Sequence, residues 1–180
     1  MKKARRNARR LRPAAAKRRA APRAPADRML VRAARPAERR LVLDLVERLL
    51  AELGEEGEET GLLPKPALAA SWGRRGPAVA AFLAFDATGR AIGVTTLSES
   101  WAAYAGGAYG IVNEMYVVPE HRSRRVGARL LAAVREHGLR RGWRRIDVTA
   151  PESPRWDRSR RFYEQLGFVF TGPKLKLLLV

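Results

Sequence analysis

Apolar and polar residues follow one another in short blocks along most of the chain, and the period of each block predicts its secondary structure. Apolar runs of strand length predict strands at residues 29–33, 78–85, 91–97, 111–118 and 145–149. Apolar residues at helical spacing predict helices at residues 36–53, at residues 62–73, from Val126 onward, and at residues 155–166. Two short strands, residues 168–170 and 175–179, are expected to close the chain. Hairpins mixed with two crossover connections indicate an α/β (α+β) fold, with a mixed central sheet and helices on both faces.

The first residues of the chain differ in composition from the rest. Residues 1–27 hold 11 Lys and Arg against a single acid, Asp27, out of a total net charge of +18. This segment has too few apolar side chains to offset the conformational entropy that it would lose on folding. We therefore expect residues 1–28 to be a disordered basic tail and residues 29–180 to form one domain. The tail could be an inert segment, an arm that binds polyanions, a targeting peptide, or sequence translated upstream of a true start at Met29. We favour the inert and upstream interpretations over nucleic-acid binding.

The residue counts exclude several classes of protein. With no cysteine and two histidines, the chain can form neither a disulfide framework nor a thiolate metal site, and we expect no metal. His121 and His137 have no carboxylate or hydroxyl partner close in the sequence, so we expect both on the surface. The sequence contains no run of 18 apolar residues, so no transmembrane helix is expected. We therefore expect a cytoplasmic protein.

A strand, a basic loop and a helix follow one another from Asn113 to Gly142, and this succession is typical of an anion site. The strand ends before Pro119, and the helix begins near Val126. The N–H groups of a first helical turn have no intrahelical partner, and the helix dipole adds about half a positive charge there. Residues 122–125 add cationic and hydroxyl donors, and Gly127 should let a ligand approach the backbone closely. This arrangement suits a pyrophosphate.

The run VVPEHRSRRVGARLL resembles the acyl-CoA-binding motif of the GCN5-related N-acetyltransferase (GNAT) superfamily, Arg/Gln-x-x-Gly-x-Gly/Ala. Arg122 takes the first place and Gly127 the last, while Arg125 stands where the middle glycine is usual. Arginine is strained there if the position needs a positive φ, and is tolerated if the position is already helical. The run RFYEQLGF, residues 161–168, resembles the C-terminal signature of the family. Trp156 and Ser159 depart from the Asn and Ala that family members often carry before it.

The resemblance covers residues 29–180 and implies a GNAT-like, mostly antiparallel central sheet. It also implies an N-acetyltransferase that moves an acetyl group from acetyl-CoA to a primary amine, by direct attack in a ternary complex. The backbone of residues 115–117 should pair with the pantetheine amides, and residues 123–128 should hold the pyrophosphate. The cofactor-binding residues expected are Met115, Tyr116, Val117, Arg122, Ser123, Arg124, Arg125, Val126, Gly127 and Ala128.

Acyl transfer to an amine needs a base for the ammonium proton and benefits from an acid for the leaving thiolate. Glu114, a lone carboxylate in an apolar strand, is our first choice of base, acting through a water, and Asp147 is the second. Glu114 could instead be a solvent-facing residue paired with an arginine. Tyr163 is the expected acid, because a phenol with a pKa near 10 stays protonated at neutral pH.

The acceptor is less defined. Glu55–Glu59 could form an electronegative rim that favours a small polycation such as a polyamine or aminoglycoside, and a protein amine is the alternative. Trp101 and Tyr104 lie in an expected loop, residues 101–107; they could cover the acceptor, but we favour packing against the sheet edge. A non-catalytic acyl-CoA sensor and a nucleic-acid binder acting through its tail remain alternative functions. The oligomeric state is expected to be monomer or homodimer.

Overall fold

The computed structural model describes residues 29–54, 65–149 and 156–172. Its helices and strands are β1 (Leu30–Ala33), α1 (Arg39–Gly54), α2 (Lys65–Arg75), β2 (Val79–Phe85), β3 (Ala91–Ala102), β4 (Gly107–Val117), α3 (Val126–Arg140), β5 (Ile146–Val148) and α4 (Asp157–Gln165). Single turns of 3-10 helix lie at Pro36–Glu38, Gly76–Ala78, Ala103–Ala105 and Pro119–His121. The basic tail, the acidic run at residues 55–59 and the strand expected at residues 175–179 lie outside the described residues.

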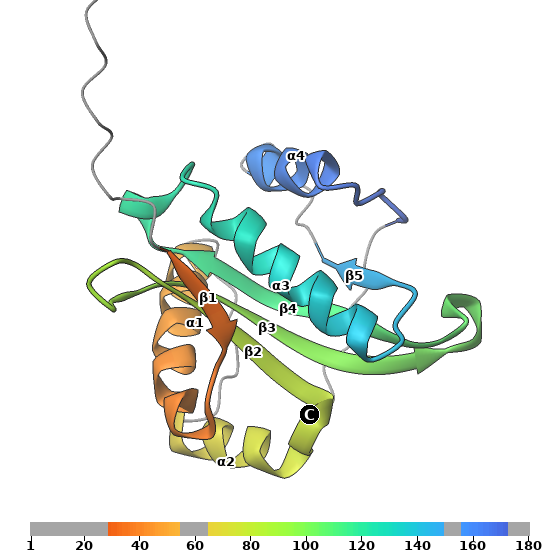
Figure 1. The fold of residues 1–180 in the computed structure, drawn as a ribbon, viewed down its shortest axis with the longest axis horizontal. Helices are drawn as coiled ribbons and strands as arrows, with labels where there is room; N and C mark the ends of the chain where they lie inside the picture. The colour runs from red at the N-terminus through yellow and green to blue at the C-terminus, as the bar shows by residue number, and fades with distance from the viewer. Residues whose placement is uncertain (1–28, 55–64, 150–155, 173–180) are drawn as a thin grey trace, which may run out of the picture.

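The strands form one sheet in the order β1-β2-β3-β4-β5. Neighbours are antiparallel except β4 and β5, which are parallel. Figure 1 shows α3 lying over one face of the sheet, beside β4 and β3. Gly93 approaches Val126 and Leu130 of α3, whereas Tyr116 points from the opposite face toward Glu52 of α1. The expected mixed, mostly antiparallel sheet with helices on both faces is confirmed.

The hairpin between β2 and β3 shows how the local sequence sets the fold. One carboxylate oxygen of Asp86 accepts hydrogen bonds from the backbone N–H groups of Thr88 (2.9 Å) and Arg90 (3.0 Å). Gly89 then takes φ 82°, which a residue without a Cβ adopts at no steric cost. This turn brings β3 back along β2, and the hairpin expected from the sequence is confirmed.

The segment from Trp101 to Gly107 differs from its prediction as a loop. β3 continues to Ala102 and β4 already begins at Gly107, so the hairpin is longer at its closed end. The register pairs Trp101 with Ala108 across this extension. Alanine and glycine lack the apolar pattern of a strand, which is why the extension was missed. The packing expected for Trp101 was wrong, since its side chain is 72% exposed, whereas Tyr104, although 70% exposed, contacts the ring of Tyr109 in β4 and the guanidinium of Arg145.

Two further assignments change. Residues 168–170 are not in a strand, and Val169 and Phe170 are exposed. The partner expected for them lies outside the described residues. His137 was expected on the surface, because it has no partner close in the sequence. In the structure it is half-buried, with its ring edge-on to Phe82 and Trp143.

Candidate active site

The central strand β4 is irregular at its middle. Thr96 of β3 lies opposite Glu114, but the next residue, Leu97, lies opposite Val112, so Asn113 is an extra residue that forms a β-bulge. Bulges bend a strand and strengthen its twist. β5 pairs with β4 only at Gly110–Val112. The parallel strands β4 and β5 therefore separate immediately before the bulge.

This separation leaves one edge of β4 without a strand partner in the described part of the chain. The N–H of Val118 donates to the C=O of Ile92 at 3.1 Å, so this pair faces β3. Backbone groups along a strand alternate in direction, so those of Tyr116 also face β3, and those of Met115 and Val117 point to the open edge. An extended molecule carrying amide groups could pair along this edge as an added strand does.

Arg122, at the start of the loop after β4, is held by the protein on two sides. Its Nε donates to the C=O of Val117 at 2.9 Å. Its Nη2 lies 2.7 and 2.8 Å from the two carboxylate oxygens of Glu52 in α1. The guanidinium therefore ties the loop to the end of β4 and to α1, and leaves the N–H of Val117 and both backbone groups of Met115 at the open edge.

The rest of the loop turns through two left-handed residues. Ser123 has φ 62° and Arg125, the N-cap residue of α3, has φ 63° and ψ 13°. Arg125 thus takes the strained alternative at the place where the family motif has glycine, at a cost of about 1 kcal/mol. Strained residues of this kind cluster at functional sites, where they aim backbone groups.

The first turn of α3 has no side-chain cap. Its N–H groups are those that α-helices leave without an intrahelical partner, and the helix dipole makes this end positive. Arg124 and Arg125 are exposed and form no ion pair with the described residues. Backbone donors and two unneutralised guanidinium groups could together hold a phosphate.

Helix α4 is attached to this loop and strand by three side chains. Nη2 of Arg158 donates to Oγ of Ser123 at 2.7 Å, and the hydroxyl of Tyr163 lies 3.9 Å from the sulfur of Met115. Phe162 packs on Gly127 so closely that an added Cβ would lie 2.9 Å from its Cζ. The space expected at Gly127 for a ligand is thus occupied by an aromatic ring. Sequence reasoning missed Arg158, because no motif marks a position five residues before the tyrosine.

Glu114 and Tyr163 lie on opposite sides of β4, because Glu114 and Met115 are neighbours whose side chains point to opposite faces. Glu114 is half-buried and hydrogen-bonded to Thr96 rather than paired with an arginine, and burial raises the pKa of its carboxyl. Burial also raises the pKa of Tyr163 to about 12. The open edge of β4 therefore runs between a carboxyl and a protonated phenol.

Asp147 is placed differently from Glu114. Its carboxylate accepts a hydrogen bond from Nε of Arg145 at 2.6 Å. It lines a pocket of about 950 Å³ between β5, α4 and the segment after α4, which Tyr163 also lines and Glu114 does not. The geometry brings Asp147 and Tyr163 to one pocket, but Arg145 already neutralises the carboxylate.

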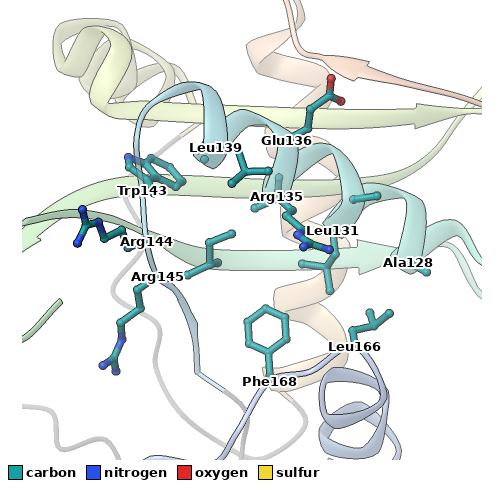
Figure 2. Close-up of a pocket in the computed structure, with 14 residues that line it drawn as sticks. Ala128, Leu131, Arg135, Glu136, Leu139, Trp143, Arg144, Arg145, Leu166 and Phe168 are labelled. Atoms are coloured by element: carbon teal, nitrogen blue, oxygen red, sulfur yellow. The ribbon is translucent and has the colours of Figure 1, made fainter. Parts of the chain in front are cut away.

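A second pocket, of about 720 Å³, lies between α3 and residues 166–168. Figure 2 shows its apolar floor, with Leu131, Leu139 and Phe168 pointing inward and the guanidinium of Arg145 directed away. Ala128 is the one predicted site residue in its lining.

The Acetyltransferase (GNAT) family model matches residues 43–168, more than half of the chain. The chain belongs to the GNAT acetyltransferase family. A comparison with curated proteins returned no match. Among the described residues of this GNAT protein, no group of three or more His, Cys, Asp or Glu could hold a metal ion. No helix in the described ranges has the length and apolar character needed to cross a bilayer.

Solved structures show the same fold. An acetyltransferase of Trypanosoma brucei is 23% identical, with 84% of this chain and 99% of that chain covered and a TM-score of 0.63. A predicted acetyltransferase of Clostridium acetobutylicum, solved with acetyl-CoA, is 18% identical, with coverage of 83% and 96% and a TM-score of 0.68. AAC(6')-Iy, solved with the bisubstrate analogue CoA-S-monomethyl-acetylneamine, is 22% identical, with coverage of 86% and 99% and a TM-score of 0.67.

Proposed function

We propose that this GNAT protein is an N-acetyltransferase that moves an acetyl group from acetyl-CoA to a primary amine by direct attack in a ternary complex. The observation that carries the proposal is the open edge of β4, which leads from the bulge at Asn113 to the first turn of α3. A carboxyl and a phenol lie on its two sides. Each group suits one step of acyl transfer.

The residues present fit coenzyme A. The open-edge groups of Met115 and Val117 match the amides of a pantetheine arm, which lies extended like a strand. The N–H groups at Val126–Ala128, with Ser123 and the side chains of Arg124 and Arg125, match a diphosphate. The backbone of Tyr116 pairs with β3, and Arg122 bonds the C=O of Val117 and Glu52 of α1, so both residues fix the position of this surface. Acetyl-CoA supplies the activated acyl group.

Glu114 acts as the base in this proposal. An alkylammonium with a pKa near 10 attacks only after losing a proton. Burial raises the pKa of the Glu114 carboxyl, which narrows the gap to the ammonium. The carboxylate is still a weaker base than the amine, so we propose that a water between the two groups carries the proton. Asp147 is the second candidate, and its carboxylate is already paired with Arg145.

Tyr163 acts as the acid. Its hydroxyl lies beside Met115, whose backbone faces the open edge where the thioester would lie. With a pKa of about 12 the phenol is protonated at neutral pH and can donate to the departing thiolate. An open-edge N–H can polarise the thioester carbonyl. Positioning the two reactants supplies much of the remaining rate.

We propose a small-molecule amine as the acceptor. Support comes from the relative solved with a bisubstrate analogue that joins coenzyme A to acetylneamine, an amine-bearing sugar derivative. In the described part of the site, Glu114 is the carboxylate that no arginine neutralises, so it favours one positive charge near the open edge. A peptide amine is the alternative acceptor.

The test is a turnover screen of the full chain with acetyl-CoA against polyamines, aminoglycosides, amino acids and peptides, following thiol release, with calorimetry of acetyl-CoA binding beside it. Thiol release that depends on one class of amine supports the enzyme and identifies its acceptor. Binding without release on any acceptor indicates a sensor. No heat with acetyl-CoA or a longer acyl-CoA overturns the proposal. Deleting residues 1–28 should leave turnover unchanged, whereas a tail-driven nucleic-acid binder should lose affinity and its salt dependence.

A further inference from the structure

Thr96 of β3 lies directly opposite Glu114 of β4, at the bulge. It is 8% exposed, and its side chain shares the face of the sheet on which Glu114 lies. Two hydrogen bonds join the residues: the N–H of Glu114 donates to Oγ1 of Thr96 at 3.2 Å, and the Thr96 hydroxyl donates to Oε2 of Glu114. The carboxyl is therefore held through the same side chain that fixes its own backbone.

The directions of these two bonds matter. A threonine hydroxyl has one proton and two lone pairs. The N–H of Glu114 occupies a lone pair of Oγ1, and the hydroxyl proton points to the carboxylate. An ionised carboxylate only accepts hydrogen bonds, so this arrangement suits the ionised form of Glu114. It is also the form that a general base needs.

We propose that Thr96 is a positioning residue for catalysis, which fixes the Glu114 carboxyl at the open edge of β4 and keeps it in its ionised, proton-accepting form. This inference rests on the proposed function, because it needs Glu114 to be the base. Thr96 itself does not contact the reacting atoms. Its role is to set the orientation and protonation of the group that does.

In the described ranges, no charged side chain holds the Glu114 carboxyl in place of Thr96. Burial raises the pKa of the Glu114 carboxyl, and no charged side chain contributes to this shift. Tyr116 lies two residues along on the same face, close to Glu52, Arg48 and Arg122, which act on its phenol.

On the neighbouring strand, Arg145 and Asp147 pair with each other, and Tyr163 lies across β4 on the opposite face. A hydroxyl that donates to the ionised form lowers a carboxyl pKa, so the bond from Thr96 opposes the effect of burial. Removing it should raise the pKa of Glu114 further.

The next residue provides a matched control. Thr95 is completely buried on the opposite face, and its hydroxyl has no hydrogen-bond partner in the described part of the chain. Thr95→Val and Thr96→Val make the same chemical change one residue apart in the same strand. Only Thr96→Val removes a hydrogen-bond donor from the Glu114 carboxyl.

The experiment measures kcat/KM against pH, with the best amine of the screen, for wild type, Thr96→Val, Thr96→Ser and Thr95→Val. Calorimetry measures acetyl-CoA affinity for each variant. We expect Thr96→Val to move the acidic limb of the profile to higher pH and to lower kcat near neutral pH about tenfold, with acetyl-CoA affinity unchanged. Thr96→Ser should restore both, because it keeps the hydroxyl, and Thr95→Val should match wild type.

An acidic limb that stays in place in Thr96→Val, or that moves equally in Thr95→Val, overturns the inference while leaving the acetyltransferase proposal intact. A carboxyl NMR titration of Glu114 in the same variants decides the point without turnover: its pKa should rise in Thr96→Val alone. Wild type that neither binds acetyl-CoA nor releases thiol refutes the proposed function instead, and the inference about catalysis falls with it.

Discussion

Replacing Gly127 with alanine is expected to lower turnover far more than stability. The family motif admits glycine or alanine at this place, so the motif alone predicts a harmless change. In the structure the added Cβ would lie 2.9 Å from Cζ and 3.4 Å from Cε2 of Phe162. Carbon atoms prefer separations of about 3.5–4.0 Å, so the ring must retreat by about 0.6–1 Å.

The cost of this retreat divides unequally between stability and catalysis. Overpacking costs about 1–3 kcal/mol, and alanine recovers about 1 kcal/mol of helix propensity, so the net loss of stability is at most about 2 kcal/mol. Phe162 packs edge-on against Tyr163, with ring centroids 5.2 Å apart, so the proposed acid moves with it. A misplacement of about 1 Å can lower a rate about 10²-fold.

Thiol release gives kcat and KM, and urea denaturation gives the free energy of unfolding. The control is the double variant Gly127→Ala/Phe162→Leu, in which the shorter side chain removes the overlap, compared with Phe162→Leu alone. We expect the double variant to have a higher kcat than Gly127→Ala. A Gly127→Ala variant with wild-type kcat, or a double variant no faster than Gly127→Ala, refutes the idea that Phe162 transmits the change to Tyr163.

Three further substitutions test separate parts of the structure. Tyr163→Phe should lower kcat about 10²-fold. Because the pKa of Tyr163 is raised to about 12, wild type should show no loss from phenol ionisation up to about pH 10 in a pH–rate profile. Arg158→Met breaks the bond to the loop and should raise KM for acetyl-CoA more than it lowers kcat, whereas Arg160→Met, on the same helix but paired within it, should match wild type in the same assay. Gly110→Ala places a methyl group inside the ring of buried Trp143 and should lower the free energy of unfolding by about 3 kcal/mol, and a loss below about 1 kcal/mol in denaturant titration would show that the ring is free to move.

The order and type of most elements could be predicted from the sequence, because helices and strands carry their periodicity in neighbouring residues. Helix α1 shows its apolar stripe in Val42, Leu45 and Val46, which are all buried. The turn at Asp86 carries its own hydrogen-bonding side chain. The basic loop before α3 and the C-terminal signature lie in continuous stretches, so they identified the family without any knowledge of the fold.

Tertiary structure alone decided which residues meet. Thr96 faces Glu114 only because the strand register and the bulge put them opposite each other, and nothing in either local sequence marks the pair. Arg158 reaches Ser123 because of how α4 lies against the loop. The left-handed conformation of Arg125 was one of two alternatives that the motif left open. Local periodicity reflects interactions between residues that are close in the sequence. Contacts across the sheet depend instead on how distant segments bury surface against each other. The candidate site is built from contacts of this second kind.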